Sequence, residues 1–237
     1  MRTAEWTTSV TVLDRVTAVL EAFGEDDEGL GVSELARRAN LPKSTVSRVA
    51  AELVAQQYLD RVGDRFHIGM RLFELGRTVE RPRMLRQRAL PVMAHLRALT
   101  GASVLLGILD GADVVVLAVT RAQPAAVAVP RVGARLPAHA TALGKALLAF
   151  APPGAADDAV LERELAEIRR NGVATDRGER PATGFCLAGA VIDAGGAACA
   201  SIGVVGQADQ LDTAPITAAV RASAMTLSRR GGSARVS

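Results

Sequence analysis

The sequence predicts an α+β protein with two domains, a winged helix-turn-helix followed by a larger domain built on a largely antiparallel sheet. Residues 31–69 show a helix, a turn, a second helix and a hairpin in succession, which is typical of a winged helix-turn-helix. Beyond about residue 100, predicted strands and helices mix without a regular βαβ alternation, which favours an α+β domain. A chain of 237 residues can bury one small and one mid-sized core.

The composition is that of a globular protein whose basic charge is local. Hydrophobic residues make up 49% of the chain and charged residues 22%, which excludes a disordered protein. The formal net charge of +3 is too small to indicate nucleic-acid binding. Residues 37–71 hold 7 Lys or Arg against 3 Asp or Glu, although residues 1–80 as a whole hold 10 against 13. Residues 81–100 add 5 Arg and no acidic residue. The basic charge therefore forms patches.

Two cysteines in a chain of this length do not indicate a disulfide framework. The N-terminus lacks the basic and then apolar pattern of a signal peptide. Asp193 is the only charged residue between residues 182 and 208, but this stretch is rich in glycine. Two buried strands joined by a turn at Asp193 explain it better than a membrane span. We expect a soluble, cytoplasmic protein with no membrane partner.

The first domain should contain three helices and a hairpin. A first helix is predicted over Thr11–Phe23, with Leu13 on its buried stripe. A second helix over 34–39 ends at the break Asn40–Pro42. A third helix over Lys43–Gln57 follows, with one apolar stripe facing a core.

The exposed side of the third helix has the residue types of a recognition helix. Hydroxyl groups near a helix start suit phosphate contacts, and arginine suits base edges in the major groove. The hairpin has a two-residue turn at Gly63-Asp64 flanked by basic residues, as expected of a wing. The alternative is a small helical subdomain with a solvated face. The DNA-binding residues predicted are Lys43, Ser44, Thr45, Ser47, Arg48, Arg61 and Arg65.

The remaining elements follow a linker helix. We expect that helix over Met70–Glu80 and place the domains at 1–80 and 81–230, with a disordered tail at 231–237. Strands are predicted over Ser103–Leu109, Val114–Val119 and Ala125–Val129, and a further pair flanks Asp193. Helices are predicted over Leu90–Leu99 with a start at Pro91, and over Thr141–Phe150, Asp158–Arg170 and Thr213–Arg230.

These motifs resemble a known family. ELARRANLPKSTVSRVAAELVAQQYLDR followed by RFHIGMRLFELG resembles the N-terminal domain of IclR-type bacterial transcriptional regulators. LPAHATALGKALLA, the segment 172–179 and the strand pair around Asp193 are similar to that family's effector domain. The resemblance runs from about Ser9 to Arg229. It implies a GAF-like effector domain, a small-molecule effector, a palindromic double-stranded DNA operator and a homo-oligomer, either a dimer or a dimer of dimers. It also implies that the first helix helps to pair two DNA-binding domains.

The resemblance also implies where an effector binds. Backbone N–H groups of Ala142 and Leu143 would take part, and the family's acidic and cysteine positions match Asp176 and Cys186. Two positions that are serine in the carboxylate sensors of the family are Gly203 and Val205 here. Because two hydroxyl donors are missing, we expect a larger or more apolar ligand than glyoxylate or pyruvate, such as an aromatic acid or a lactone. Phe185 is a further candidate to line the pocket.

The sequence offers no set of catalytic residues. It has no GxGxxG, P-loop or GxSxG motif, and none of its three histidines has metal-ligand spacing. Cys186 with His139 could form a nucleophile and base, but a cysteine in an apolar strand is more often a buried hydrophobe. Lys145 is expected to be structural. We therefore predict a regulator, repressor or activator, with no catalytic residue, metal or cofactor. The alternatives are a sensor or scaffold without DNA binding, and an enzyme using Cys186.

Overall fold

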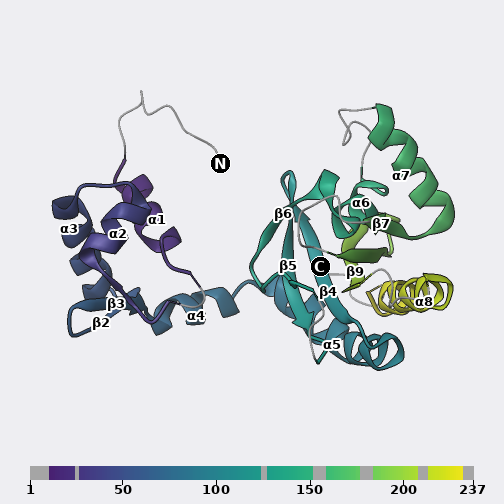
Figure 1. The fold of residues 1–237 in the computed structure, drawn as a ribbon, viewed down its shortest axis with the longest axis horizontal. Helices are drawn as coiled ribbons and strands as arrows, with labels where there is room; N and C mark the ends of the chain where they lie inside the picture. Colours follow the sequence, from purple (N-terminus) through teal and green to yellow (C-terminus); the bar gives the residue numbers. More distant parts are fainter. Residues whose placement is uncertain are drawn as a thin grey trace. The chain divides into compact units, whose positions relative to one another are not determined.

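The computed structural model describes residues 11–24, 27–123, 127–151, 159–176, 184–207 and 213–231 (Figure 1). The chain divides into two compact units, Met1–Glu80 and Arg81–Ser237. Asp158, the predicted start of a helix, and the predicted tail beyond residue 231 lie outside the described residues. Among the described residues, no helix is long and apolar enough to cross a lipid bilayer.

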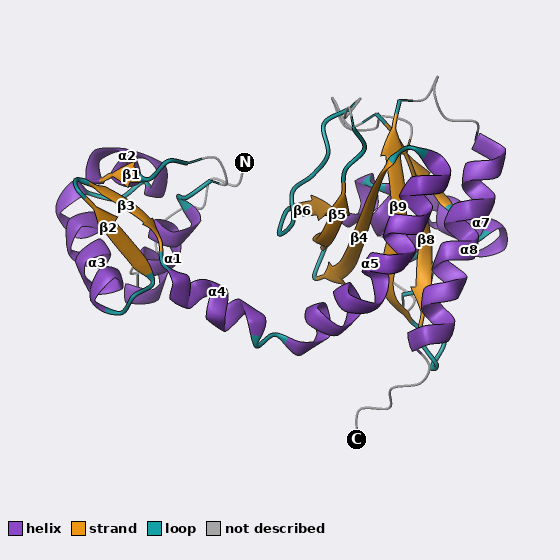
Figure 2. Ribbon diagram, turned by 90° about the horizontal axis from the view of Figure 1, so that it is seen from below, coloured by secondary structure: helices purple, strands orange, loops and turns teal. Residues whose placement is uncertain are grey.

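The first unit is a winged helix-turn-helix, as the sequence predicts. Its strands form a three-stranded antiparallel sheet in the order β1-β3-β2 (Figure 2). Val19, Leu35, Val46 and Leu59 lie at the centre of its core. Its elements are α1 Val12–Glu21, β1 Leu30–Gly31, α2 Val32–Ala39, α3 Lys43–Ala55, β2 Leu59–Val62, β3 Arg65–Ile68 and α4 Met70–Arg77.

The turn between α2 and α3 follows from its residue types. Asn40 ends α2 in the left-handed conformation, at a φ of 52°, which asparagine tolerates better than most residues. Pro42 is the N-cap of α3, where its missing N–H removes no helical hydrogen bond. At the wing, Val62 pairs with Arg65 across a two-residue turn in which Gly63 has a φ of 63°. The helix break and the hairpin are confirmed.

The helix start predicted at Pro91 is wrong, because one helix, α5 (Glu80–Thr100), runs through this residue. Proline costs a helix one hydrogen bond, here to the carbonyl of Gln87. Pro91 is exposed, whereas Ala89, Met93 and Leu96 form a buried stripe on both sides of it. Burial of that stripe holds the helix together across the missing bond, and water can reach the Gln87 carbonyl on the exposed side.

The second unit is built on a six-stranded sheet in the order β6-β5-β4-β9-β8-β7, in which every described pair is antiparallel. The antiparallel sheet and the hairpin around Asp193 are confirmed. The Asp193 carboxylate closes that hairpin, since its Oδ1 accepts hydrogen bonds from the backbone N–H groups of Gly195 and Ala197. The strands are β4 Ser103–Asp110, β5 Asp113–Thr120, β6 Arg135–Pro137, β7 Ala174–Asp176, β8 Phe185–Ile192 and β9 Ala198–Gly206.

The strand predicted over Ala125–Val129 is not formed by its described part, 127–129. The outer edge of β5 pairs instead with β6 and with the residues just before β6. In that preceding segment, the Val116 N–H donates to the Ala134 carbonyl. Val127 and Val129 pack their side chains against the core without joining the ladder. The apolar pattern correctly indicated burial, but proline at 130 lacks the N–H that would extend a ladder.

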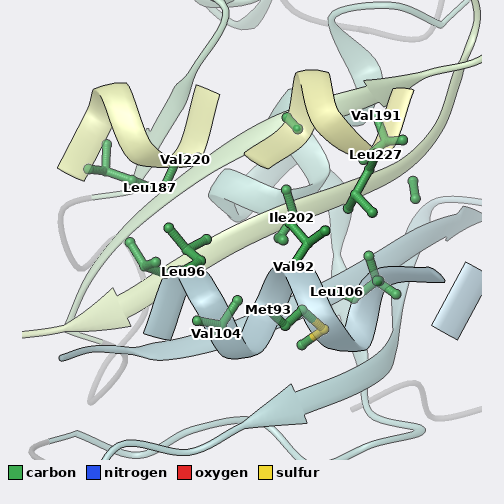
Figure 3. Close-up of a cluster of buried hydrophobic side chains, with 14 of the residues drawn as sticks. Val92, Met93, Leu96, Val104, Leu106, Leu187, Val191, Ile202, Val220 and Leu227 are labelled. Atoms are coloured by element: carbon green, nitrogen blue, oxygen red, sulfur yellow. The ribbon is translucent and has the colours of Figure 1, made fainter. Parts of the chain in front are cut away.

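Helices cover both faces of this sheet. Helices α5 and α8 (Thr213–Gly231) pack on one face, where Met93, Leu96, Ile202 and Val220 are fully buried (Figure 3). A short 3-10 helix (Ala138–Ala140), α6 (Ala142–Leu148) and α7 (Ala159–Asn171) lie on the opposite side. Residues along a strand point alternately to these two faces, so every second residue packs against the same set of helices.

Candidate functional site

The five candidates on α3 share one accessible surface. Lys43, Ser44, Ser47 and Arg48 are exposed and Thr45 is half-buried, while Val46, Val49, Ala50 and Leu53 are buried in the core. Among the described residues, no carboxylate lies within ion-pair distance of Lys43 or Arg48. The surface therefore presents hydroxyls and two cations that form no ion pair, with Glu52 one helical turn after Arg48.

The arginines of the wing are held in place by the wing itself. Arg61 donates from Nε to the Gly63 carbonyl at 3.1 Å, and its guanidinium lies 5.6 Å from the centre of the Phe66 ring. Arg65 donates from Nη1 to the Gly29 carbonyl at 2.9 Å. Both side chains are exposed. Because a guanidinium has five N–H donors, each side chain keeps donors for an anion. These bonds fix the direction in which the charges extend.

Two other arginines of the unit are committed to carboxylates. Arg38 bonds Asp27 at 2.7 Å and Glu34 at 2.8 Å, and Arg37 bonds Glu34 at 2.6 Å. The hydrogen bonds from Arg37 and Arg38 lower the pKa of Glu34 from 4.5 to about 2. Asp27 and Glu34 are thus paired with arginines close to α2 and do not neutralise the cations of α3, although the unit as a whole is slightly acidic.

An apolar groove that sequence reasoning missed lies between α1 and α3. It measures about 540 Å³, and its walls include Val12, Val16, Val49 and Tyr58, with Arg48 at its border. Leu13 was predicted to face the core, yet 74% of its surface is exposed, next to Val12 at 72%. The 3.6-residue period of a helix does not say which of two adjacent apolar stripes is buried. In the sequence, the groove was indicated by apolar residues on α1 that cover more than one stripe of the helix.

Four of the effector-site candidates fall on one face of the second sheet. Asp176, Cys186 and Val205 stand directly opposite one another on β7, β8 and β9, and Gly203 faces Ala188 one register step away. Cys186 and Val205 belong to the apolar cluster that α6 and α7 cover. All of these side chains are buried. Residues 177–183, which include Glu179 of the predicted motif, join β7 to β8 and lie outside the described residues.

The start of α6 is fixed by its cap and by a close helix contact. The Thr141 hydroxyl accepts a hydrogen bond from the Gly144 N–H at 3.1 Å and donates to the Pro137 carbonyl at 3.3 Å. The first N–H groups of a helix have no acceptor within it, and those of Ala142 and Leu143 are in this turn. A methyl group on Gly144 would lie 2.1 Å from the Ala138 carbonyl oxygen. Only glycine allows α6 to lie this close to the 3-10 helix.

The structure separates Phe185 from the other effector-site candidates. Its side chain belongs to the cluster under α5 and α8, on the opposite face from Cys186. Adjacent residues of a strand point to opposite faces, so Phe185 and Cys186 cannot line the same surface of the sheet. The prediction that Phe185 joins these residues is corrected on this ground.

The surroundings of Cys186 do not activate its thiol as a nucleophile. Burial and the charge of Asp176 raise the pKa of the Cys186 thiol from 9.0 to about 12, so the thiol is neutral near pH 7. His139, its imagined base, is exposed, whereas Cys186 is buried. Lys145 is buried and pairs with Glu164 at 2.9 Å. Among the described residues, no group of three or more His, Cys, Asp or Glu side chains could hold a metal ion.

Comparison with protein families covers nearly the whole chain. The model of the IclR helix-turn-helix domain matches residues 12–63. The model of the C-terminal domain of the bacterial transcriptional regulator IclR matches residues 79–160 and 152–229.

Two named regulators are similar in sequence. The HTH-type transcriptional regulator BhcR of Paracoccus denitrificans is 32% identical over 235 residues, covering 91% of this chain and 84% of BhcR. The HTH-type transcriptional regulator XynR of Escherichia coli is 31% identical over 196 residues, covering 74% of this chain and 78% of XynR.

Solved structures agree with the fold. An IclR homolog from Microbacterium hydrocarbonoxydans, crystallised with 4-hydroxybenzoate, has a TM-score of 0.81 and 31% identity, covering 93% of this chain and 100% of that chain. The Thermotoga maritima IclR has a TM-score of 0.72 at 23% identity, covering 93% and 98% of the two chains, which supports the fold alone.

Proposed function

Because this chain belongs to the IclR family of bacterial transcriptional regulators, we propose that it binds a palindromic DNA operator as a dimer and responds to a small molecule. DNA binding is the function that the family models and the named relatives support. The observation that carries the proposal for this chain is the exposed face of α3, where hydroxyls and two cations lie together and neither cation forms an ion pair with a described carboxylate.

The residues on that face divide by chemistry. Arg48 contacts a base edge in the major groove, because a guanidinium can donate two hydrogen bonds to guanine. Ser44, Thr45 and Ser47 share contacts to phosphates and base edges. Lys43, Arg61 and Arg65 serve phosphates and the minor groove, since Arg61 and Arg65 extend from the wing. In this scheme the phosphate contacts supply affinity and Arg48 supplies sequence preference.

Two exposed apolar surfaces support a dimer. One is formed by Val12 and Leu13 of α1 beside the groove, and the other by α4, which buries none of its residues. Met70 and Phe73 of α4 are exposed by 65% and 61%. Apolar surface of this extent is typical of an interface. A two-fold dimer places two recognition helices on half-sites about one turn of DNA apart, or a multiple of it.

The second unit is the place for the ligand. Asp176 and Cys186 provide polar groups on a buried sheet face, and Ala142 and Leu143 contribute N–H groups at the start of α6. Gly203 and Val205 offer no hydroxyl, which favours a ligand with more apolar surface than glyoxylate or pyruvate. The similar Microbacterium protein was crystallised with 4-hydroxybenzoate. We infer that this chain binds an aromatic acid or a lactone-like molecule, and of these two classes we favour the aromatic acids.

Ligand binding regulates DNA binding only if the ligand prefers one arrangement of the dimer. A ligand with equal affinity for the DNA-competent and DNA-incompetent arrangements shifts nothing. If the ligand prefers the first arrangement it strengthens DNA binding, and if it prefers the second it releases the operator.

Fluorescence anisotropy with a duplex from the region upstream of the protein's own gene, and a scrambled duplex of equal length, tests the DNA-binding part. We expect tight binding to the native duplex alone and a steep fall of log K with log salt concentration. Equal and weak binding to both duplexes would contradict the proposal and favour a sensor without DNA binding.

A further inference from the structure

Ser201 has a buried hydroxyl that the fold leaves unused. Within the described part of the chain, its Oγ is the buried side-chain oxygen or nitrogen found without a hydrogen-bond partner. None of its residue surface is exposed to solvent. A buried hydroxyl without a partner costs folding free energy, so a serine in an otherwise apolar strand requires an explanation. Sequence reasoning missed it because β9 reads as a plain hydrophobic strand.

The hydroxyl stands on the same face of the sheet as the effector-site candidates. Its neighbours along β9, Ala200 and Ile202, face α5 and α8, so the side chain of Ser201 points to the α6 side. In the ladder Ser201 lies between Gly107 of β4 and Ala190 of β8. A Cβ atom built on Gly107 would lie 3.7 Å from the Ser201 Oγ. The hydroxyl therefore stands beside Gly107 of β4, over which the Val114 side chain packs.

The neighbours of this hydroxyl on β8 and β9 are small, whereas Leu105 of β4 and Val114 of β5 are larger residues on the same face. Gly107 and Ala190 flank Ser201, and the next register step holds Gly203 opposite Ala188. None of these four neighbours extends beyond a methyl group. The next step along the same face holds Val205 opposite Cys186, which in turn faces Asp176. Small residues thus connect the polar pair to Ser201, and a flat ring packs well against such a surface.

We propose that the Ser201 hydroxyl binds a hydroxyl or carbonyl group of the effector. The inference rests on the proposed function and narrows the ligand to a class, aromatic acids that carry a neutral polar substituent in addition to the carboxylate. Gly203 and Val205 provide no hydroxyl near the Asp176 end of this face, whereas Ser201 provides one further along β9. In the bound state the unpaired Oγ gains its partner, and a ligand without the substituent leaves it unpaired.

The alternative is that a buried water or a small shift of the chain satisfies the hydroxyl within the protein. The two explanations differ in the effect of removing the hydroxyl from the ligand-free protein. If it is unpaired, Ser201→Ala keeps or raises the melting temperature, because a desolvated polar group is lost. If it is satisfied internally, the same change lowers the melting temperature.

Ser228 provides a matched control on the other side of the sheet. Its Oγ accepts a hydrogen bond from the Ile192 N–H at 2.8 Å and donates to the Ala224 carbonyl at 2.9 Å. Ser228→Ala removes a satisfied hydroxyl, so it should lower the melting temperature of the ligand-free protein. It should leave the preference between ligands unchanged, because the residue lies on α8.

The test combines melting temperatures with calorimetric binding of 4-hydroxybenzoate and benzoate, which differ by one hydroxyl. We expect Ser201→Ala to weaken the binding of 4-hydroxybenzoate about tenfold, the size of one hydrogen bond to a buried group. The binding of benzoate should weaken less than about twofold. Equal weakening of both acids, or a melting temperature that falls as in Ser228→Ala, would overturn the role of Ser201. Failure of both acids to bind the parent protein would instead contradict the proposed ligand class.

Discussion

Asp176 lies directly opposite Cys186 in the β7–β8 ladder, and both side chains are buried. Burial is the larger cause, and the nearby carboxylate the smaller, of a thiol pKa of about 12 for Cys186. A thiol with this pKa stays protonated near pH 7 and is a poor nucleophile. It can still donate a weak hydrogen bond. The thiol is therefore unsuited to covalent catalysis.

The raised pKa of Cys186 predicts a loss of stability at alkaline pH. The stabilising contribution of the protonated thiol is complete below pH 9, the unfolded value, and is lost as the pH rises toward the folded pKa of about 12. We expect the melting temperature of the parent protein to fall from pH 9 to pH 11, and that of Cys186→Ser to fall less. Ser228→Ala, which removes no ionisable group, serves as the control and should retain the parent slope. Parallel curves for the parent and Cys186→Ser would contradict the raised pKa.

Arg48→Ala should weaken DNA binding and blur its sequence preference. Loss of a two-bond contact to a base costs about 1–3 kcal/mol, and the preference at one base pair should relax. Competition binding with operator variants measures both effects. Arg97→Ala, an exposed arginine on α5, removes the same charge as a control. A uniform loss over all duplexes with unchanged preference would assign Arg48 to the phosphates.

Sequence reasoning predicted what depends on local pattern. The helix break at Asn40 and Pro42 and the turn at Gly63 depend on backbone preferences of single residues. The continuity of α5 through Pro91 and the paired edge of β5 depend on tertiary packing, which local patterns do not contain. The same holds at the site. The row of Asp176, Cys186 and Val205 requires the register of three strands, and the separation of Phe185 follows from the side of the sheet it faces.

Gly144→Ala should destabilise the second unit. The added methyl group would lie 2.1 Å from the Ala138 carbonyl oxygen and 2.3 Å from its Cα, so α6 must move away from the 3-10 helix. Overpacking of this kind costs about 1–3 kcal/mol. Gly76→Ala is the matched control, since α4 leaves open space around that position. Alanine is there expected to be neutral or stabilising by about 0.5–1 kcal/mol. Denaturant unfolding compares the two, and equal stabilities would contradict the close contact.

Phe73→Glu should weaken the proposed dimer. The side chain of Phe73 is exposed by 61% on a helix that buries none of its residues, and a carboxylate in an apolar interface is costly. Light scattering after size-exclusion chromatography, over a range of concentrations, should show more monomer for this variant. Val132→Glu places the same charge on an exposed residue of the second unit and should behave as the parent. Unchanged mass for Phe73→Glu would exclude α4 from the interface.

In the proposed function, a ligand on the α6 face of the second sheet changes DNA binding by the first unit. The most direct test is an anisotropy titration of the native duplex, with and without an aromatic acid that calorimetry shows to bind, on the parent, Asp176→Ala and Cys186→Ser. We predict that the acid shifts the parent curve and that both variants bind DNA like the parent without the acid but lose the shift. Superimposed parent curves at saturating acid would contradict the coupling, and loss of DNA binding by both variants without acid would make Asp176 and Cys186 residues of the fold alone.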